Sequence, residues 1–200
     1  EKISRLFGLI GYPLSHSFSQ KYFREKFKTE HIKGVDYLNF QLHKIEELQK
    51  VIENNPLLTG FNVTIPYKEK ILKILDEIDS DAQQMGAVNT VKLIHTSKGK
   101  ILKGYNTDFY GFFTSLTKIM KGSEKKALVL GNGGASKAVV YGLKKLDLEV
   151  YIASRNNLTI PGTMLYGQLD QIFLSKIDII VNTTPLGMWP EVDQYPDINY

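Results

Sequence analysis

Three glycines after an apolar run have the spacing that suits binding of a phosphate group. Gly131, Gly133 and Gly134 follow residues 127–130 and precede residues 136–145, whose apolar positions have helical spacing. A backbone without Cβ can turn sharply and let a pyrophosphate approach, and the following helix offers free N–H groups and the positive end of its dipole. The pattern predicts a strand, a turn and a helix that bind a dinucleotide. A purely structural turn is the alternative, because Ser136 replaces the third glycine of the usual G-x-G-x-x-G motif.

The end of the next apolar run, residues 150–153, carries a basic residue where an NAD site usually carries an acid. Ser154 and Arg155 occupy this position, whereas Asp147 and Glu149 precede the run. A planar guanidinium is a donor fork for phosphate oxygens and suits the 2′-phosphate of NADP. The sequence therefore predicts NADP rather than NAD.

Two serines follow the first predicted strand, residues 5–11, and precede a predicted helix with aromatic residues on one face. Ser17 and Ser19 are residue types that cap helices well, and this segment alone favours capping. Hydrogen bonding to a polyhydroxylated or carboxylate ligand is the functional alternative.

A further predicted strand, residues 60–65, bears Asn62 and Thr64 on one face near its end. Pro66 suits the first turn of a helix that would follow, so Lys68 would lie near a helix N-terminus. A cation there is disfavoured by roughly 0.3–1 kcal/mol, so this lysine is either simply exposed or has a chemical role.

Residues 87–91 lead into a predicted hairpin with its turn at residues 97–99. Asn89 lies at the start of this hairpin. Asp108 opens a predicted helix, residues 109–121, where an acid is electrostatically favourable and capping is the simplest interpretation.

Composition indicates a globular protein of one or two domains, since 200 residues with 42% hydrophobic and 23% charged residues can build a substantial core. The apolar runs are short and interrupted by charge, which argues against a membrane span or a signal peptide. The chain has no cysteine and its four histidines lack ligand spacing, so we expect no metal and a cytoplasmic location. The net charge is +4, but the basic residues are scattered along the chain and form no block that would indicate a nucleic-acid site.

Taken in order, these motifs closely resemble the shikimate dehydrogenase family of NADP-dependent enzymes in chorismate and aromatic amino-acid biosynthesis. The series is S-H-S-F-S, N-x-T-x-P-x-K, G-A-V-N-T, G-x-N-T-D, the glycine turn and N-T-T-P-L-G-M, and it spans nearly the whole chain. The resemblance implies an N-terminal α/β substrate domain, residues 1–105, and a Rossmann-like NADP-binding domain, residues 106–200. It places the active site in the cleft between them, where 3-dehydroshikimate is reversibly reduced to shikimate.

The resemblance also implies roles for individual residues. Lys68 would be catalytic and paired with Asp108, without need of a metal. The remaining substrate contacts would be Ser17 and Ser19 on the carboxylate and Asn62, Thr64, Asn89 and Asp108 on ring hydroxyls. The cofactor contacts would be Gly131, Asn132, Gly133, Gly134, Ala135 and Ser136 at the pyrophosphate, Ser154, Arg155 and Asn156 at the 2′-phosphate, and Thr183, Thr184, Pro185 and Met188 beside the nicotinamide.

Alternatives remain at this point. A quinate/shikimate dehydrogenase that uses NAD or NADP differs by one hydroxyl in its substrate, and a non-catalytic nucleotide-binding sensor would keep the glycine turn. We expect small-molecule ligands, a monomer or homodimer, and no nucleic-acid or membrane partner. Gln20, Ser154 and Lys137 depart mildly from the family pattern.

Family members continue beyond the position of Tyr200 into helices that bring a glutamine and a tyrosine towards the substrate. No residue here matches these two, and the stretch after Arg155 is short for a crossover helix. We therefore expect segments at both places to be missing from this sequence.

Overall fold

A computed structural model describes residues 2–97, 99–155, 162–190 and 192–198 of the chain. The chain divides into two compact units, Glu1–Thr107 and Asp108–Tyr200. The division lies two residues after the boundary expected at residue 105. The two units are described separately.

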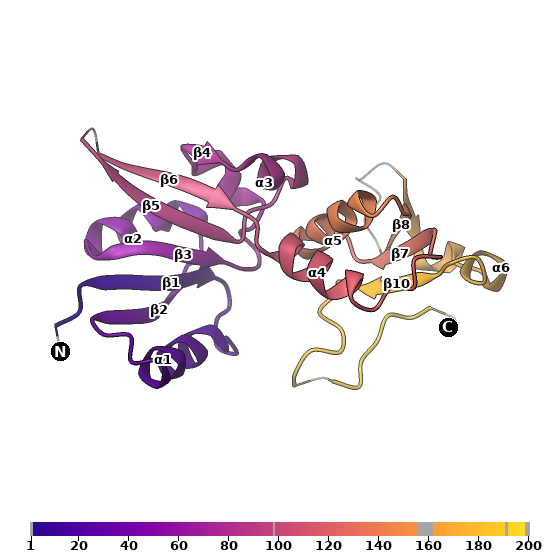
Figure 1. Cartoon of the computed structure of the whole chain (residues 1–200), viewed down its shortest axis with the longest axis horizontal. Coiled ribbons are helices and arrows are strands. Elements are labelled where there is room, and N and C mark those ends of the chain that lie inside the picture. Colours follow the sequence, from indigo (N-terminus) through magenta and orange to yellow (C-terminus); the bar gives the residue numbers. More distant parts are fainter. Residues whose placement is uncertain (1, 98, 156–161, 191, 199–200) are drawn as a thin grey trace. The chain divides into compact units, whose positions relative to one another are not determined.

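In the described part of the first unit, six strands form one mixed sheet in the order β2-β1-β3-β5-β6-β4 (Figure 1). The strands are β1 (Arg5–Gly11), β2 (Val35–Gln41), β3 (Leu58–Val63), β4 (Glu77–Ile78), β5 (Thr90–Thr96) and β6 (Gly99–Tyr105). Strands β2, β1 and β3 are parallel, whereas β5 runs antiparallel to both β3 and β6. The carboxyl end of β3 therefore lies beside the start of β5, where Asn62 pairs with Thr90.

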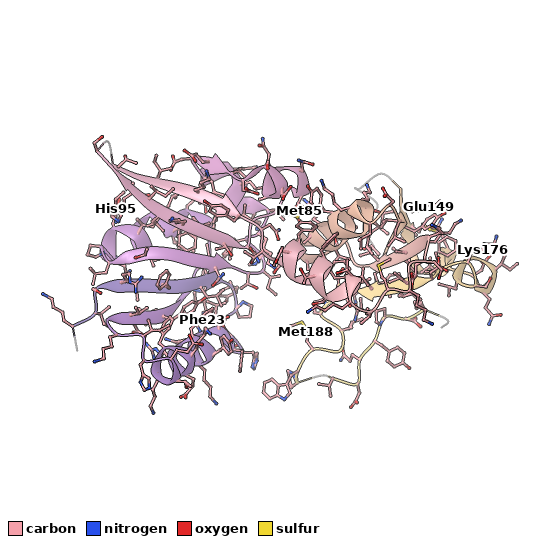
Figure 2. The ribbon with its side chains drawn as sticks, in the orientation of Figure 1. Phe23, Met85, His95, Glu149, Lys176 and Met188 are labelled. Atoms are coloured by element: carbon pink, nitrogen blue, oxygen red, sulfur yellow. The ribbon has the colours of Figure 1, made fainter. Side chains whose placement is uncertain are left out.

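Helices cover both faces of this sheet. The helical segments are α1 (Ser19–Thr29), η1 (Ile45–Glu47), α2 (Leu48–Asn54), η2 (Lys70–Ile74) and α3 (Ser80–Met85). Successive side chains of a strand point to opposite faces, so Ile10 joins the larger core with α2 and η2, whereas Leu9 packs with Tyr37 on the face beneath α1. Figure 2 shows Phe23 of α1 directed at the sheet, where its ring stacks on Tyr37 with 4.6 Å between centroids.

The prediction of an α-helix after Pro66 is wrong. The chain forms only the short 3₁₀ helix η2 and then enters β4 at the sheet edge. Asp76 explains the difference, because its backbone N–H donates to the Leu102 carbonyl at 3.0 Å and its carboxylate accepts the Leu102 N–H at 2.7 Å. Pairing with β6 thus replaces helical hydrogen bonds, and Lys68 precedes a five-residue 3₁₀ helix rather than an α-helix.

The second unit contains a parallel sheet in the order β10-β7-β8-β9 across its described residues. Its strands are β7 (Lys126–Leu130), β8 (Glu149–Ser154), β9 (Thr163–Leu165) and β10 (Ile179–Asn182), and its helical segments are α4 (Asp108–Thr117), α5 (Gly134–Lys145), η3 (Tyr166–Gln168) and α6 (Gln171–Leu174). Residues 127–130 of β7 are fully buried, because the strand is covered on both faces. Its side chains on one face join a core cluster with α5, and those on the other face join a cluster with residues near α6. This strand–helix alternation is the Rossmann-like arrangement that the glycine turn predicts.

Two details of this unit differ from the sequence expectations. Residues 166–174, whose apolar spacing is consistent with one short helix, form the two segments η3 and α6, and β9 was not predicted. The predicted helix over residues 109–121 begins at Asp108 and ends at Thr117. No helix within the described ranges has the length and apolar character needed to span a membrane.

Candidate functional site

Predicted substrate residues of the first unit meet where β3 ends and β5 begins. The Asn62 amide oxygen accepts the Tyr37 hydroxyl at 2.8 Å, and its amide nitrogen donates to the Thr90 hydroxyl at 3.2 Å. Thr90 in turn donates to the Asn89 amide oxygen at 3.0 Å. The structure thus joins Asn62 and Asn89, which lie in different sequence motifs, through one hydrogen-bonded row.

Asn89 is held by the segment that ends this unit. Its amide oxygen accepts the backbone N–H of Thr107 at 2.9 Å, and its amide nitrogen donates to the Thr107 hydroxyl at 2.9 Å. Asn106 is also buried and donates to the Ala87 carbonyl at 3.0 Å. The G-A-V-N-T and G-x-N-T-D motifs therefore fold against each other, and both ends of the Asn89 amide have a defined partner.

The two serines do not cap α1. Phe18 is the N-cap residue and no side chain caps the helix. The capping interpretation is therefore wrong. The buried Ser17 hydroxyl oxygen has no hydrogen-bond partner in the described part of the chain. A buried hydroxyl of this kind is suited to a ligand, since an unsatisfied polar group is costly.

Thr64 and Lys68 follow β3 in a segment fixed by backbone contacts. The Thr64 N–H donates to the Ile10 carbonyl at 2.9 Å, and a Cβ at Gly11 would lie 2.4 Å from Cγ2 of Thr64. The Lys68 carbonyl accepts the Val88 N–H at 2.8 Å, which holds the lysine segment beside that of Asn89. Asp108 belongs to the second unit, so its pairing with Lys68 stays a prediction.

A cavity of about 470 Å³ adjoins the polar row on the face beneath α1. Aromatic side chains form much of its wall, together with polar groups of Asn62 and Thr90. Tyr37 also lines it and is 2% exposed, and burial raises the pKa of this phenol well above its usual value. The phenol therefore stays protonated at neutral pH and can donate to Asn62.

The glycine turn of the second unit packs against the loop after β10. Gly131 has a φ of +104°, and a Cβ there would lie 2.8 Å from the Thr183 hydroxyl oxygen. That hydroxyl donates to the Leu130 carbonyl at 2.7 Å, and the Asn182 amide oxygen accepts the Thr184 N–H at 2.9 Å. The structure thus brings together the glycine turn and the 183–188 loop, which the sequence assigned to one ligand.

The turn itself is open on the ligand side. A Cβ at Gly133 would meet no atom within 4 Å, and the twelve-residue helix α5 begins at the next residue. Ser136 is buried and its hydroxyl donates to the Gly133 carbonyl at 2.7 Å. The serine therefore shapes the turn from inside, while the backbone N–H groups at the helix start suit a pyrophosphate. Asn132 and Ala135 lie in the same turn.

Arg155 directly follows β8 and lines a hollow of about 960 Å³. Tyr166 and Gln168 of η3 line the same hollow. Sequence reasoning missed these two residues, because η3 is placed next to Arg155 by β9, which pairs with β8 and was not predicted. Ser154 is buried, and Asn156 lies outside the described residues. Farther along, Pro185 accepts the Met188 N–H at 3.1 Å and the Met188 side chain is exposed (Figure 2). No cluster of three or more potential metal ligands occurs among the residues that the structure describes.

Comparison with known proteins gives one consistent result. The family model described as the shikimate dehydrogenase substrate binding domain matches residues 9–91. Shikimate dehydrogenase (NADP(+)) from Clostridium beijerinckii is 42% identical over 200 residues, covering 95% of this chain and 71% of the relative. The crystal structure of shikimate dehydrogenase from Aquifex aeolicus has a TM-score of 0.79 at 34% identity, covering 98% of this chain and 74% of that one. The Thermus thermophilus structure in complex with NADP(H) and shikimate has a TM-score of 0.77 at 28% identity, covering 96% and 72%.

Proposed function

Because the chain belongs to the shikimate dehydrogenase family, we propose that its first unit binds shikimate and its second unit binds NADP. The chain is an NADP-dependent oxidoreductase that acts on a CH–OH group, and the reaction is the reversible reduction of 3-dehydroshikimate to shikimate. The observation that carries the assignment of the first unit is the row that joins Asn62, Thr90 and Asn89. Side-chain amides both donate and accept, so they suit the hydroxyls of a polyol.

The substrate contacts follow from the chemistry of each group. Ser17 and Ser19 donate to the substrate carboxylate, for which the buried Ser17 hydroxyl is the supporting observation. Asn62, Thr64 and Asn89 bind the ring hydroxyls.

Lys68 transfers the proton, and Asp108 orients the Lys68 side chain. The Lys68 ammonium donates its proton to the C3 oxygen as the ketone becomes an alcohol, and the free amine takes the proton back in the reverse reaction. The Asp108 carboxylate accepts a hydrogen bond from the ammonium and holds it towards that oxygen. NADPH, when bound, supplies the hydride.

The second unit has residues that fit NADP. The N–H groups at the start of α5 and the open side of Gly133 suit the pyrophosphate. Arg155 donates to the 2′-phosphate from the end of β8, together with Ser154 and Asn156. The 183–188 loop, packed on the glycine turn through Thr183, would contact the nicotinamide when NADP is bound.

The biological setting belongs to the same proposal. The protein acts in the cytoplasm as a monomer or homodimer, with small molecules as its only ligands. The scattered basic residues, which form no basic–aromatic block, support small molecules as the ligands.

The direct test is to incubate the purified protein with shikimate and NADP and to follow the absorbance of the reduced nicotinamide. We expect turnover, and we expect NAD to be a poor substitute. A protein that binds NADP yet leaves shikimate unchanged would instead be a nucleotide-binding sensor.

A further inference from the structure

We propose that Tyr37 is a positioning residue for shikimate, which orients Asn62 from within the fold. This inference rests on the proposed substrate site. Its starting observation is that a buried phenol is hydrogen-bonded to a residue assigned to the substrate ring. The phenol donates to the Asn62 amide oxygen at 2.8 Å.

The direction of this hydrogen bond is fixed by the number of protons. A neutral phenol has a single hydrogen, and the Asn62 amide oxygen can only accept. Tyr37 therefore donates to Asn62. The orientation of the Asn62 amide follows, with its nitrogen on the opposite side, towards Thr90 at 3.2 Å.

Packing fixes the position of the Tyr37 side chain. Tyr37 is 2% exposed, its ring stacks on Phe23 with an interplanar angle of 16°, and β2 holds its backbone in register with Phe7 of β1. The burial that raises the pKa of the phenol also keeps the donor proton in place across the neutral and moderately alkaline range.

The consequence for binding concerns Asn62. An amide oxygen has two lone pairs, and the phenol takes one, so the other stays available to a ring hydroxyl. Without the phenol hydroxyl, the amide can rotate and present its nitrogen instead. Tyr37 thus affects substrate binding through Asn62 and does not need to touch the substrate.

The experiment is the variant Tyr37→Phe, which removes only the hydroxyl. We expect the KM for shikimate to rise about 3- to 10-fold, the range for loss of one hydrogen bond, while the KM for NADP stays unchanged and kcat changes little. Tyr67→Phe is the matched control, because Tyr67 is also 2% exposed and donates its hydroxyl to the Leu42 carbonyl at 2.6 Å in the other core. This control should lose stability without changing the KM for shikimate.

A double-mutant cycle with Asn62→Ala distinguishes positioning from general destabilisation. If Tyr37 acts through Asn62, Tyr37→Phe has no further effect on the KM once Asn62 is alanine. An unchanged KM in Tyr37→Phe, or a full additional effect in the double variant, would overturn the inference. Should Tyr37→Phe fail to fold, Thr90→Val removes the other side-chain partner of Asn62 and must also raise the KM. A wild-type protein that does not bind shikimate would contradict the proposed function itself.

Discussion

Gly131 and Thr183 are so close that any side chain at residue 131 collides with the threonine. A Cβ at Gly131 would lie 2.8 Å from the Thr183 hydroxyl oxygen, and the φ of +104° is one that other residues rarely adopt. This contact couples the conformation of the glycine turn to the loop after β10. Gly133 differs from Gly131 in this respect, because a side chain at residue 133 would enter open space.

The first prediction compares alanine at these two glycines. Gly131→Ala should destabilise the second unit by about 1–3 kcal/mol, the usual cost of a strained backbone conformation, and should weaken NADP binding. Gly133→Ala should leave the thermal midpoint nearly unchanged but should still weaken NADP binding, because its methyl group occupies the space for the pyrophosphate. Thermal unfolding and NADP titration of both variants check this. Equal melting and equal NADP affinity in the two variants would contradict the assignment.

The second prediction concerns cofactor choice. Arg155→Asp should lower kcat/KM for NADP by about 10- to 100-fold, the range for a hydrogen bond to a charged group, and should reverse the preference in favour of NAD. Arg24→Gln is the control, because it also removes one guanidinium, from a residue that pairs with Asp36 in the first unit at 2.7 Å. Steady-state kinetics with both cofactors measure the ratio. If the native protein uses NAD and NADP equally, a quinate/shikimate dehydrogenase becomes the better description.

The third prediction tests proton transfer. Lys68→Ala should lower kcat by about 10²–10⁴, with a much smaller change in the KM for shikimate. Lys70→Ala is the control, since Lys70 belongs to the same segment and lies over the Tyr67 ring at 5.8 Å. This variant should keep its kcat. Loss of substrate affinity alone in Lys68→Ala would make Lys68 a binding residue, and the proton would need another donor.

The fourth prediction concerns stability in acid. Asp178 accepts the N–H groups of Lys125 and Lys126 at 2.8 and 2.9 Å, and these hydrogen bonds lower the pKa of its carboxyl. A lowered pKa in the folded state stabilises the protein above the unfolded value, which is about 3.9, and the contribution is lost as the pH falls through the folded value. Thermal midpoints of the native protein and Asp178→Asn should therefore differ at pH 7, and the difference should shrink as the pH falls below about 3.9. A constant difference across this range would contradict the role of the carboxylate.

Local sequence patterns predicted the elements that hold the two halves of the candidate site. The apolar run and glycine turn around Gly131 and the apolar run in residues 5–11 are strong local signals, and the structure confirms these elements. A helix was expected after Pro66 because the apolar residues 71, 72, 75 and 78 have helical spacing. The prediction was wrong because residues 76–78 pair with β6, which local spacing does not reveal. Three-residue β9 depends on its neighbour β8 in the same way.

Tyr37 shows why part of a site escapes sequence reasoning. An aromatic residue in an alternating strand is normally a core residue, and Tyr37 does lie in a core cluster. Its hydroxyl donates to Asn62, 25 positions later in the sequence, so only the folded chain reveals this contact.

The hydrogen bonds between Asn89 and Thr107 determine where the chain can be divided into separate pieces. A fragment that ends at Tyr105, the boundary expected from sequence, would keep the buried Asn89 but lose the N–H and the hydroxyl of Thr107 that satisfy its amide. Each hydrogen bond lost in this way costs about 0.5–1.5 kcal/mol, a noticeable part of the stability of a small domain. A fragment of the first unit should therefore include Thr107, because the connecting residues belong to its structure rather than to a passive linker.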